Sequence, residues 1–133
     1  MKEPEWVDLE DVLAFHEDML SRFGGLPGVR DQGLLESALN RAKQLHIYGN
    51  PDLFDMAAAY AIGIVKNHPF NDGNKRAGFM AAALFLEING ESFEAAEVDV
   101  VLKTLALAAG ECSEVGYAEW LRGACPRRRR KRT

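Results

Sequence analysis

Apolar residues recur at three- and four-residue spacing in six blocks along this 133-residue chain, and no block alternates apolar and polar residues over the length of a strand. Polar N-cap residues and glycine or proline breaks separate the blocks. The pattern predicts an all-α single domain, a compact bundle of about six helices. The expected helices cover residues 9–23, 32–45, 53–66, 74–89, 98–109 and a last one from 113 toward Pro126.

Two of the predicted helices are apolar almost all round. Residues 53–66, which follow the cap Asp52, are rich in alanine, and residues 74–89 contain a long apolar run that Gly90 ends. Helices without a polar face are expected at the centre of a bundle. The first two helices instead carry one apolar stripe each. His16 lies within the first stripe and is interpreted as a histidine at the edge of the core. Three cations, Arg30, Arg41 and Lys43, are interpreted as the solvated face of the second helix.

A polar nonapeptide separates the two central helices: His68-Pro69-Phe70-Asn71-Asp72-Gly73-Asn74-Lys75-Arg76. His68 can act as a general base toward a hydroxyl. Asp72 offers oxygen ligands suited to Mg²⁺ shared with phosphates. Gly73 permits a positive φ just before the positive end of a helix, and Lys75 and Arg76 can neutralise a phosphoryl group. The combination predicts a phosphate site on a loop between buried helices.

Each residue of the nonapeptide also has a plainer interpretation. A histidine before proline is commonly a surface residue, Asp72 could cap the next helix, and Asn-Asp-Gly is a common turn. Phe70 is expected to anchor the loop in the core beneath it. The GxxxxGK[ST] spacing of a phosphate-binding P-loop is missing. The joint presence of base, carboxylate, glycine turn and cations favours the phosphate site.

With these residues in place, the chain resembles the Fic/Doc family, whose core motif is HxFx(D/E)GNxRxxR. Lys75 after the asparagine, and Phe79 where most Fic proteins have a second arginine, are typical of the death-on-curing (Doc) toxins. The resemblance covers about residues 6–122 and includes the segments 21–28, 30–31 and 33–38. It implies catalytic roles for His68, Lys75 and Arg76, a phosphate-binding role for Gly73, Asn74, Lys75 and Arg76, and Mg²⁺ binding by Asp72.

The resemblance also implies an activity and partners. Doc-like toxins transfer the γ-phosphate of ATP to a threonine of translation elongation factor Tu, and an antitoxin controls them. The self-inhibitory pattern [S/T]xxxE[G/N] of many Fic proteins is absent here, which points to an inhibitor in trans. Family members carry a flap that pairs with an extended target segment, and Ile47 and Tyr48 in the break at 46–51 would suit it. An ordinary connector remains the alternative there. Residues 24–28 form a loop near the active site in related toxins.

Charge separates the end of the chain from its body. Residues 127–132 hold six of the sixteen cations, which leaves ten cations against twenty acids in residues 1–126. This acidic body argues against nucleic acid as the main ligand. We therefore expect a Fic/Doc-like domain over 1–125 and a disordered basic tail over 126–133. Removal of Arg127 to Thr133 should leave nucleotide binding and toxicity intact. Nucleic-acid binding through the tail remains an alternative.

The cysteines and the hydropathy of the chain indicate its cellular location. Cys112 and Cys125 have no metal-ligand spacing and indicate free thiols. The start of the chain has no apolar signal segment, and no stretch reaches transmembrane length without a charge. A cytoplasmic protein is expected. Three functions stay open: an enzyme transferring phosphate or AMP to a protein hydroxyl, an inactive relative that serves as a binding module, and a nucleic-acid binder.

Overall fold

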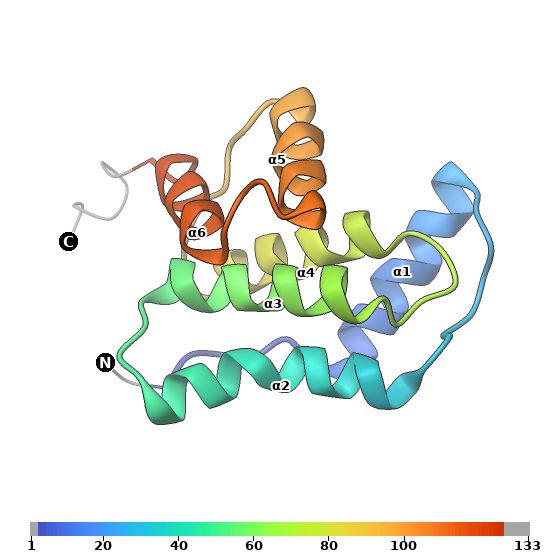
Figure 1. Cartoon of the computed structure of the whole chain (residues 1–133), viewed down its shortest axis with the longest axis horizontal. Coiled ribbons are helices and arrows are strands. Elements are labelled where there is room, and N and C mark those ends of the chain that lie inside the picture. The colour runs from blue at the N-terminus through green and yellow to red at the C-terminus, as the bar shows by residue number, and fades with distance from the viewer. Residues whose placement is uncertain (1–2, 127–133) are drawn as a thin grey trace.

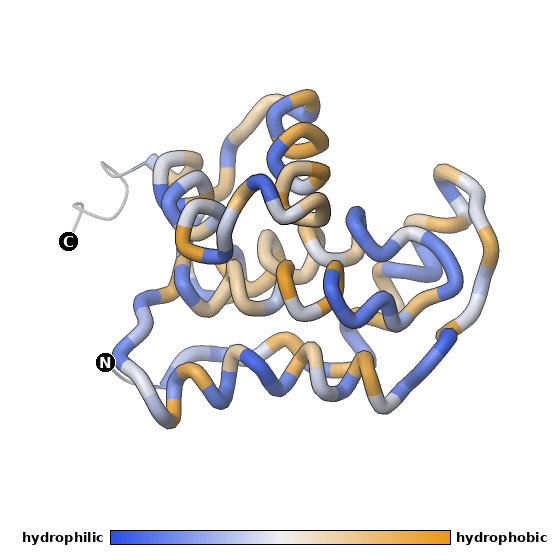
Figure 2. Tube along the Cα trace, in the orientation of Figure 1, coloured by the Kyte–Doolittle hydropathy of each residue, from blue (hydrophilic) through white to orange (hydrophobic). Residues whose placement is uncertain are grey.

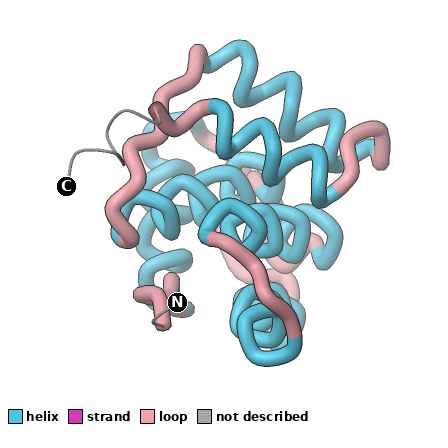
Figure 3. The backbone as a smooth tube through the Cα atoms, turned by 90° about the vertical axis from the view of Figure 1, so that its left-hand side faces the viewer, coloured by secondary structure: helices cyan, strands magenta, loops and turns pink. Residues whose placement is uncertain are grey.

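Six helices form the part of the chain that the computed structural model describes, residues 3–126 (Figure 1). Figure 3 shows helices joined by loops and no strand over these residues. The prediction of an all-α fold is therefore confirmed. The helices are α1 (Leu9–Phe23), α2 (Gln32–Tyr48), α3 (Leu53–Asn67), α4 (Asn74–Ile88), α5 (Glu97–Ala109) and α6 (Glu114–Gly123). The expected tail over 126–133 lies outside the described residues apart from Pro126.

Helix α3 is the centre of the bundle and contacts α2, α4, α5 and α6. Its middle is apolar in Figure 2, and ten of its residues are buried. Two glycines allow its neighbours to approach closely. A Cβ at Gly63 would lie 3.0 Å from the Ala38 carbonyl oxygen of α2, and a Cβ at Gly78 of α4 would lie 3.0 Å from the Ala61 oxygen of α3. Tight packing on two sides holds both ends of the α3–α4 connection in place.

One predicted break is wrong in position. Residues 46–48 were expected to leave the second helix, but α2 continues to Tyr48. The helix continues because no glycine or proline occurs between Leu34 and Gly49, and the Gly49 N–H bonds to the Leu45 oxygen at 2.9 Å. His46 also packs edge-on against Trp6, with ring centroids 5.6 Å apart. Aromatic and β-branched residues destabilise a helix by only a few tenths of a kcal/mol each, roughly. Tertiary contacts therefore decide whether the helix continues through residues 46–48.

None of the helices within residues 3–126 is long and apolar enough to cross a membrane.

Candidate active site

His68 lies where α3 ends and is its C-cap. Its backbone is left-handed, with φ 54° and ψ 53°, and its N–H bonds to the Ile64 oxygen at 3.0 Å. The residue is exposed, and it lines a cleft of about 350 Å³ together with residues of the nonapeptide and of the end of α1. The lining residues from the nonapeptide are His68, Asn71, Asp72, Gly73, Asn74, Lys75 and Arg76. The structure therefore brings the predicted base, carboxylate and cations to one cleft.

Phe70 and Asn74 hold the loop in place from its buried side. Phe70 is fully buried, and Asn74 is 4% exposed. The Asn74 side chain accepts a hydrogen bond from the Phe70 N–H and donates one to the Phe70 oxygen, both at 2.9 Å. The Asn74 amide group is therefore occupied in holding the loop. Only its backbone N–H remains to meet a phosphate.

His16 supports the same loop from α1. It is 4% exposed, and its ring stacks on Phe70 with centroids 3.7 Å apart and an interplanar angle of 10°. Its Nε2 lies 2.9 Å from the Asp72 carbonyl oxygen. Because that oxygen can only accept, Nε2 carries the hydrogen. His16 is a core histidine, as the apolar stripe predicts, and it also fixes the backbone of Asp72.

The Asp72 carboxylate accepts two backbone hydrogen bonds, from Gly73 N–H at 2.9 Å and from Leu26 N–H at 3.0 Å. It does not cap α4, whose N-cap is Gly73 and which has no side-chain cap. A carboxylate offers about four lone-pair sites, so roughly two stay open toward the cleft. That donor set fits a Mg²⁺ ion whose remaining ligands are phosphates and water. Within residues 3–126 no three His, Cys, Asp or Glu side chains gather as a metal site.

The N-terminus of α4 opens into the cleft. Gly73 is left-handed, with φ 79°, and the first helical bond runs from Ala77 N–H to the Gly73 oxygen at 2.9 Å. The N–H groups of residues 74–76 therefore have no acceptor within the helix. These N–H groups and the positive end of the helix dipole favour an anion.

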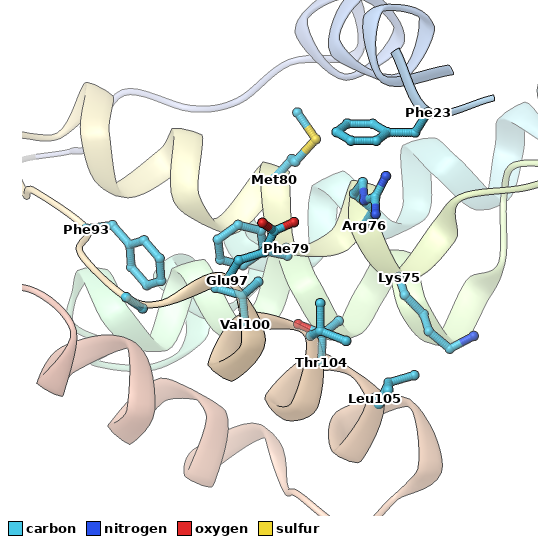
Figure 4. Close-up of a pocket in the computed structure, with 12 residues that line it drawn as sticks. Phe23, Lys75, Arg76, Phe79, Met80, Phe93, Glu97, Val100, Thr104 and Leu105 are labelled. Carbon is cyan, nitrogen blue, oxygen red and sulfur yellow. The ribbon is translucent and has the colours of Figure 1, made fainter. Parts of the chain in front are cut away.

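The two cations of the nonapeptide diverge. The Arg76 guanidinium stacks on Phe23, 4.1 Å from the ring centroid. Stacking leaves the edge of the guanidinium free for bidentate bonds to a phosphate. Figure 4 shows Lys75 extending away from Arg76 and toward the side of α5 that carries Leu105. Lys75 lines the cleft, but its ammonium does not lie beside Arg76.

A second segment, residues 24–31, lies along the loop and is called the strap here. Figure 1 shows it beside the α3–α4 connection. Its contacts with the loop include Asn71 N–H to the Gly28 oxygen at 3.1 Å and the Asn71 side chain to the Pro27 oxygen at 3.0 Å. Val29 and Phe70 form an isolated antiparallel bridge. The loop expected near the active site at 24–28 is thus part of this strap.

Arg30 was missed by the sequence analysis, which assigned it to a solvated helix face. Its Nε donates to the His68 oxygen at 2.7 Å, and its Nη2 donates to the Asn67 oxygen at 3.0 Å. Spacing alone could not show this, because Arg30 precedes α2 and the bond spans 38 residues. The signals in the sequence were a cation just before the cap Asp31 and its place in the segment 30–31, which shares the family resemblance.

Ile47 and Tyr48, the residues considered for a target-binding flap, lie elsewhere. They occupy the last turn of α2, and they are 67% and 85% exposed. The other end of α2 is beside the end of α3 that leads into the nonapeptide, where the Asn67 side chain donates to the Leu34 oxygen. At 1.5 Å per residue, Tyr48 is about 20 Å along the helix axis from Leu34. The strap, not this turn, is the segment that pairs with the loop.

Comparison with known proteins shows the family of the chain. Residues 6–86 match the Fic/DOC family. The chain belongs to this family. It is 37% identical over 115 residues to the protein kinase doc of Escherichia phage P1, which covers 85% of this chain and 90% of that protein. It is 44% identical over 99 residues to the toxin Doc of Mycolicibacterium smegmatis, which covers 72% of each chain. The resemblance to Doc-type toxins is therefore confirmed.

Phe79, the departure from the Fic motif, is part of an aromatic cluster. Its ring lies 5.3 Å from Phe93 and 6.5 Å from Trp120. Fic/DOC proteins with a second arginine have a cation at this position, whereas this chain has an apolar wall. That wall borders a groove of about 460 Å³ between α4 and α5, drawn in Figure 4. Phe23, Lys75 and Arg76 line both the groove and the cleft, so the two hollows are neighbours.

Proposed function

We propose that this protein is the toxin of a toxin–antitoxin pair and that it transfers the γ-phosphate of ATP to a serine or threonine hydroxyl of a translation factor. The observation that carries the proposal is the convergence of His68, Asp72, Arg76 and the open N-terminus of α4 on one cleft. The relatives named protein kinase doc and toxin Doc support both halves of the proposal. Family membership supports group transfer in general.

Each group has a distinct task in this proposal. His68 accepts the proton of the target hydroxyl as its oxygen attacks the γ-phosphorus, while the bond from that phosphorus to the β–γ bridging oxygen breaks and ADP leaves. The N–H groups of residues 74–76 and the Arg76 guanidinium bind the phosphate oxygens as charge develops on them. Asp72 would hold a Mg²⁺ ion, which neutralises phosphate charge when bound. Lys75 has a flexible stem, which lets its ammonium turn toward a bound phosphate.

Two residues favour phosphate transfer over AMP transfer. Lys75 adds bulk and charge where AMP-transferring relatives have glycine, and Phe79 packs with Phe93 and Trp120 instead of supplying a second cation. Both changes disfavour the triphosphate pose used for AMP transfer. By resemblance, the nucleotide is reversed and presents its γ-phosphate to His68. The target by the same resemblance is elongation factor Tu.

Control by a separate antitoxin fits the apolar groove. Val101 and Leu105 of α5 are 44% and 47% exposed, and both line the groove beside Lys75 and Arg76. An amphipathic segment laid in this groove would cover apolar surface and block the approach to the cleft. We propose that the antitoxin inhibits in this way, because the chain has no self-inhibitory pattern of its own.

Isotope placement tests the proposal. The purified protein is incubated with elongation factor Tu and Mg²⁺ and with ATP labelled at either the α or the γ phosphate. We expect label on the target from γ-labelled ATP only, and transfer about 10²–10⁴-fold slower with the variant His68→Ala. Label from the α position alone would establish AMP transfer instead. Absence of transfer from both positions, in a folded protein that binds ATP, would favour an inactive binding module.

A further inference from the structure

His68 has a backbone conformation that its residue type and its neighbour both disfavour. It is the one non-glycine residue with positive φ within residues 3–126. A left-handed conformation is disfavoured for a residue with a Cβ. The following residue is Pro69, and a residue before proline prefers extended conformations. Such strain persists only where surrounding contacts hold it.

Arg30 makes the contacts that hold this turn. Its Nε and Nη2 donate to the oxygens of His68 and Asn67, at 2.7 and 3.0 Å. Its backbone N–H donates to the next oxygen, that of Pro69, at 2.7 Å. Three consecutive carbonyl groups, from 67 to 69, are thus bound by one residue. The last carbonyls of a helix lack intrahelical donors, and a cation is favoured at that negative end.

The Arg30 side chain has these carbonyls as its partners and forms no ion pair within the described chain. Two other arginines do form ion pairs: Arg41 pairs with Glu114 and Arg122 pairs with Asp52, each at 2.6 Å. Those two arginines bind carboxylates on other helices. Arg30 binds the backbone of the residue proposed as general base.

We propose that Arg30 is a positioning residue, which holds His68 in its left-handed conformation and thereby aims the imidazole into the cleft. The inference rests on the proposed function, since it assigns a partner to the proposed base. Without the side-chain donors of Arg30, His68 relaxes toward the extended conformation that Pro69 favours. The direction of its Cα–Cβ bond then changes and the imidazole leaves the position of attack. A displacement near 1 Å can lower a rate about 10²-fold.

Three variants separate this role from a structural one. Arg30→Met removes both side-chain donors but keeps the length of the stem and the backbone bond to Pro69. Arg30→Lys restores the charge and a single donor. Arg41→Met removes an exposed cation that contacts Glu114 instead of the active-site loop. We expect kcat to fall about 10- to 100-fold with Arg30→Met while KM for ATP stays unchanged. Arg30→Lys should recover part of kcat, and Arg41→Met should match the wild type.

A second measurement reads the turn directly and needs no activity. In NMR spectra, Arg30→Met should shift the backbone amide signal of His68 and the signals of its ring, while those of His46 stay in place. Arg41→Met should leave both histidines unchanged. If the spectrum of Arg30→Met is not that of a folded protein, kcat and the His68 signals are compared between Arg30→Lys and Arg41→Met instead. That comparison then decides whether Arg30 positions His68.

Several results would overturn the inference. A wild-type kcat for Arg30→Met would do so, as would unmoved His68 signals in a variant with reduced kcat. A raised KM for the target protein with unchanged kcat would make Arg30 a target contact. The proposed function can fail separately. If the wild-type protein transfers no phosphate, the His68 signals still test the role of Arg30.

Discussion

The two junctions at the ends of α3 are both short and polar, yet they are built in opposite ways. At the α2–α3 junction, Asp52 and Asp55 form a capping box. The Asp52 side chain accepts from Asp55 N–H at 2.8 Å, and the Asp55 side chain accepts from Asp52 N–H at 3.0 Å. At the α3–α4 junction, Gly73 begins α4 without any side-chain cap. One helix N-terminus is closed by carboxylates, and the other is open.

The difference separates stability from ligand binding. A side-chain cap typically contributes about 1 kcal/mol, and an uncapped N-terminus forgoes it. The open junction at α4 keeps its N–H groups for an external anion, and its loop is held instead by His16, Asn74 and Arg30. The closed junction has its cap held from a third helix, because Arg122 of α6 binds Asp52 at 2.6 Å. We interpret the open junction as the reactive one.

The largest expected effect is at the open junction. His68→Ala should lower phosphate transfer about 10²–10⁴-fold, because it removes the proposed general base. The fold should persist, since His68 is exposed and its backbone contacts remain. Transfer rates from γ-labelled ATP and a thermal melt measure the two quantities. His46→Ala is the matched control, and equal activity losses in the two variants would contradict the role of His68.

Closing the open junction should have the next largest effect. Gly73→Asp places a negative charge beside the open N-terminus of α4, where it repels the phosphates that the N–H groups would bind. We expect kcat/KM to fall on the order of 10²-fold relative to Gly73→Asn, through like-charge repulsion. Asparagine has the same shape and meets the same neighbour, because a Cβ at position 73 would lie 2.5 Å from the Cε of Met19. If the two variants transfer phosphate equally well, charge at this position does not matter.

Opening the closed junction should affect stability alone. Asp52→Ala removes the cap of α3 and the partner of Arg122, and should lower the free energy of unfolding by about 1–2 kcal/mol. The melting temperature should fall by roughly 3–8 °C. Phosphate transfer at 25 °C should be unchanged because the residue lies at the far end of α3 from His68. A large loss of transfer in the folded variant would show that the two junctions are coupled.

The smallest expected effect is a pH dependence. Burial acts to raise the pKa of Asp52, but the hydrogen bond from Asp55 N–H and the pairing with Arg122 outweigh it, so the pKa lies below its usual value. A carboxyl with a lowered pKa in the folded protein stabilises the fold above its unfolded pKa, and this contribution is lost as pH falls through the folded pKa. The stability difference between wild type and Asp52→Asn should therefore shrink in acid. Denaturant melts from pH 7 down to about pH 3 measure this change, and a constant difference would contradict it.

Sequence reasoning predicted the helices, which the structure confirms, and the loop proposed as the active site, because both depend on local features. The apolar periodicity predicted six helices, and the nonapeptide placed His68, Asp72 and Arg76 together. Sequence reasoning could not identify Arg30, because that arginine meets its partners only when the strap folds back over the end of α3. It also placed the possible flap at Ile47 and Tyr48, since the continuation of α2 depends on tertiary contacts such as His46 with Trp6. The local sequence pattern could not predict contacts between residues that are distant in the sequence.

The most direct test of the central claim is to observe which helix N-terminus binds the phosphates of ATP. The ¹⁵N-labelled protein is titrated with Mg²⁺ and a non-hydrolysable ATP analogue, and the backbone amide signals of both junctions are followed. We predict saturable shifts for Gly73 to Arg76 and none for Leu53 to Asp55. Saturable shifts that leave Gly73 to Arg76 unmoved would contradict the assignment of the α3–α4 junction as the phosphate-transfer site.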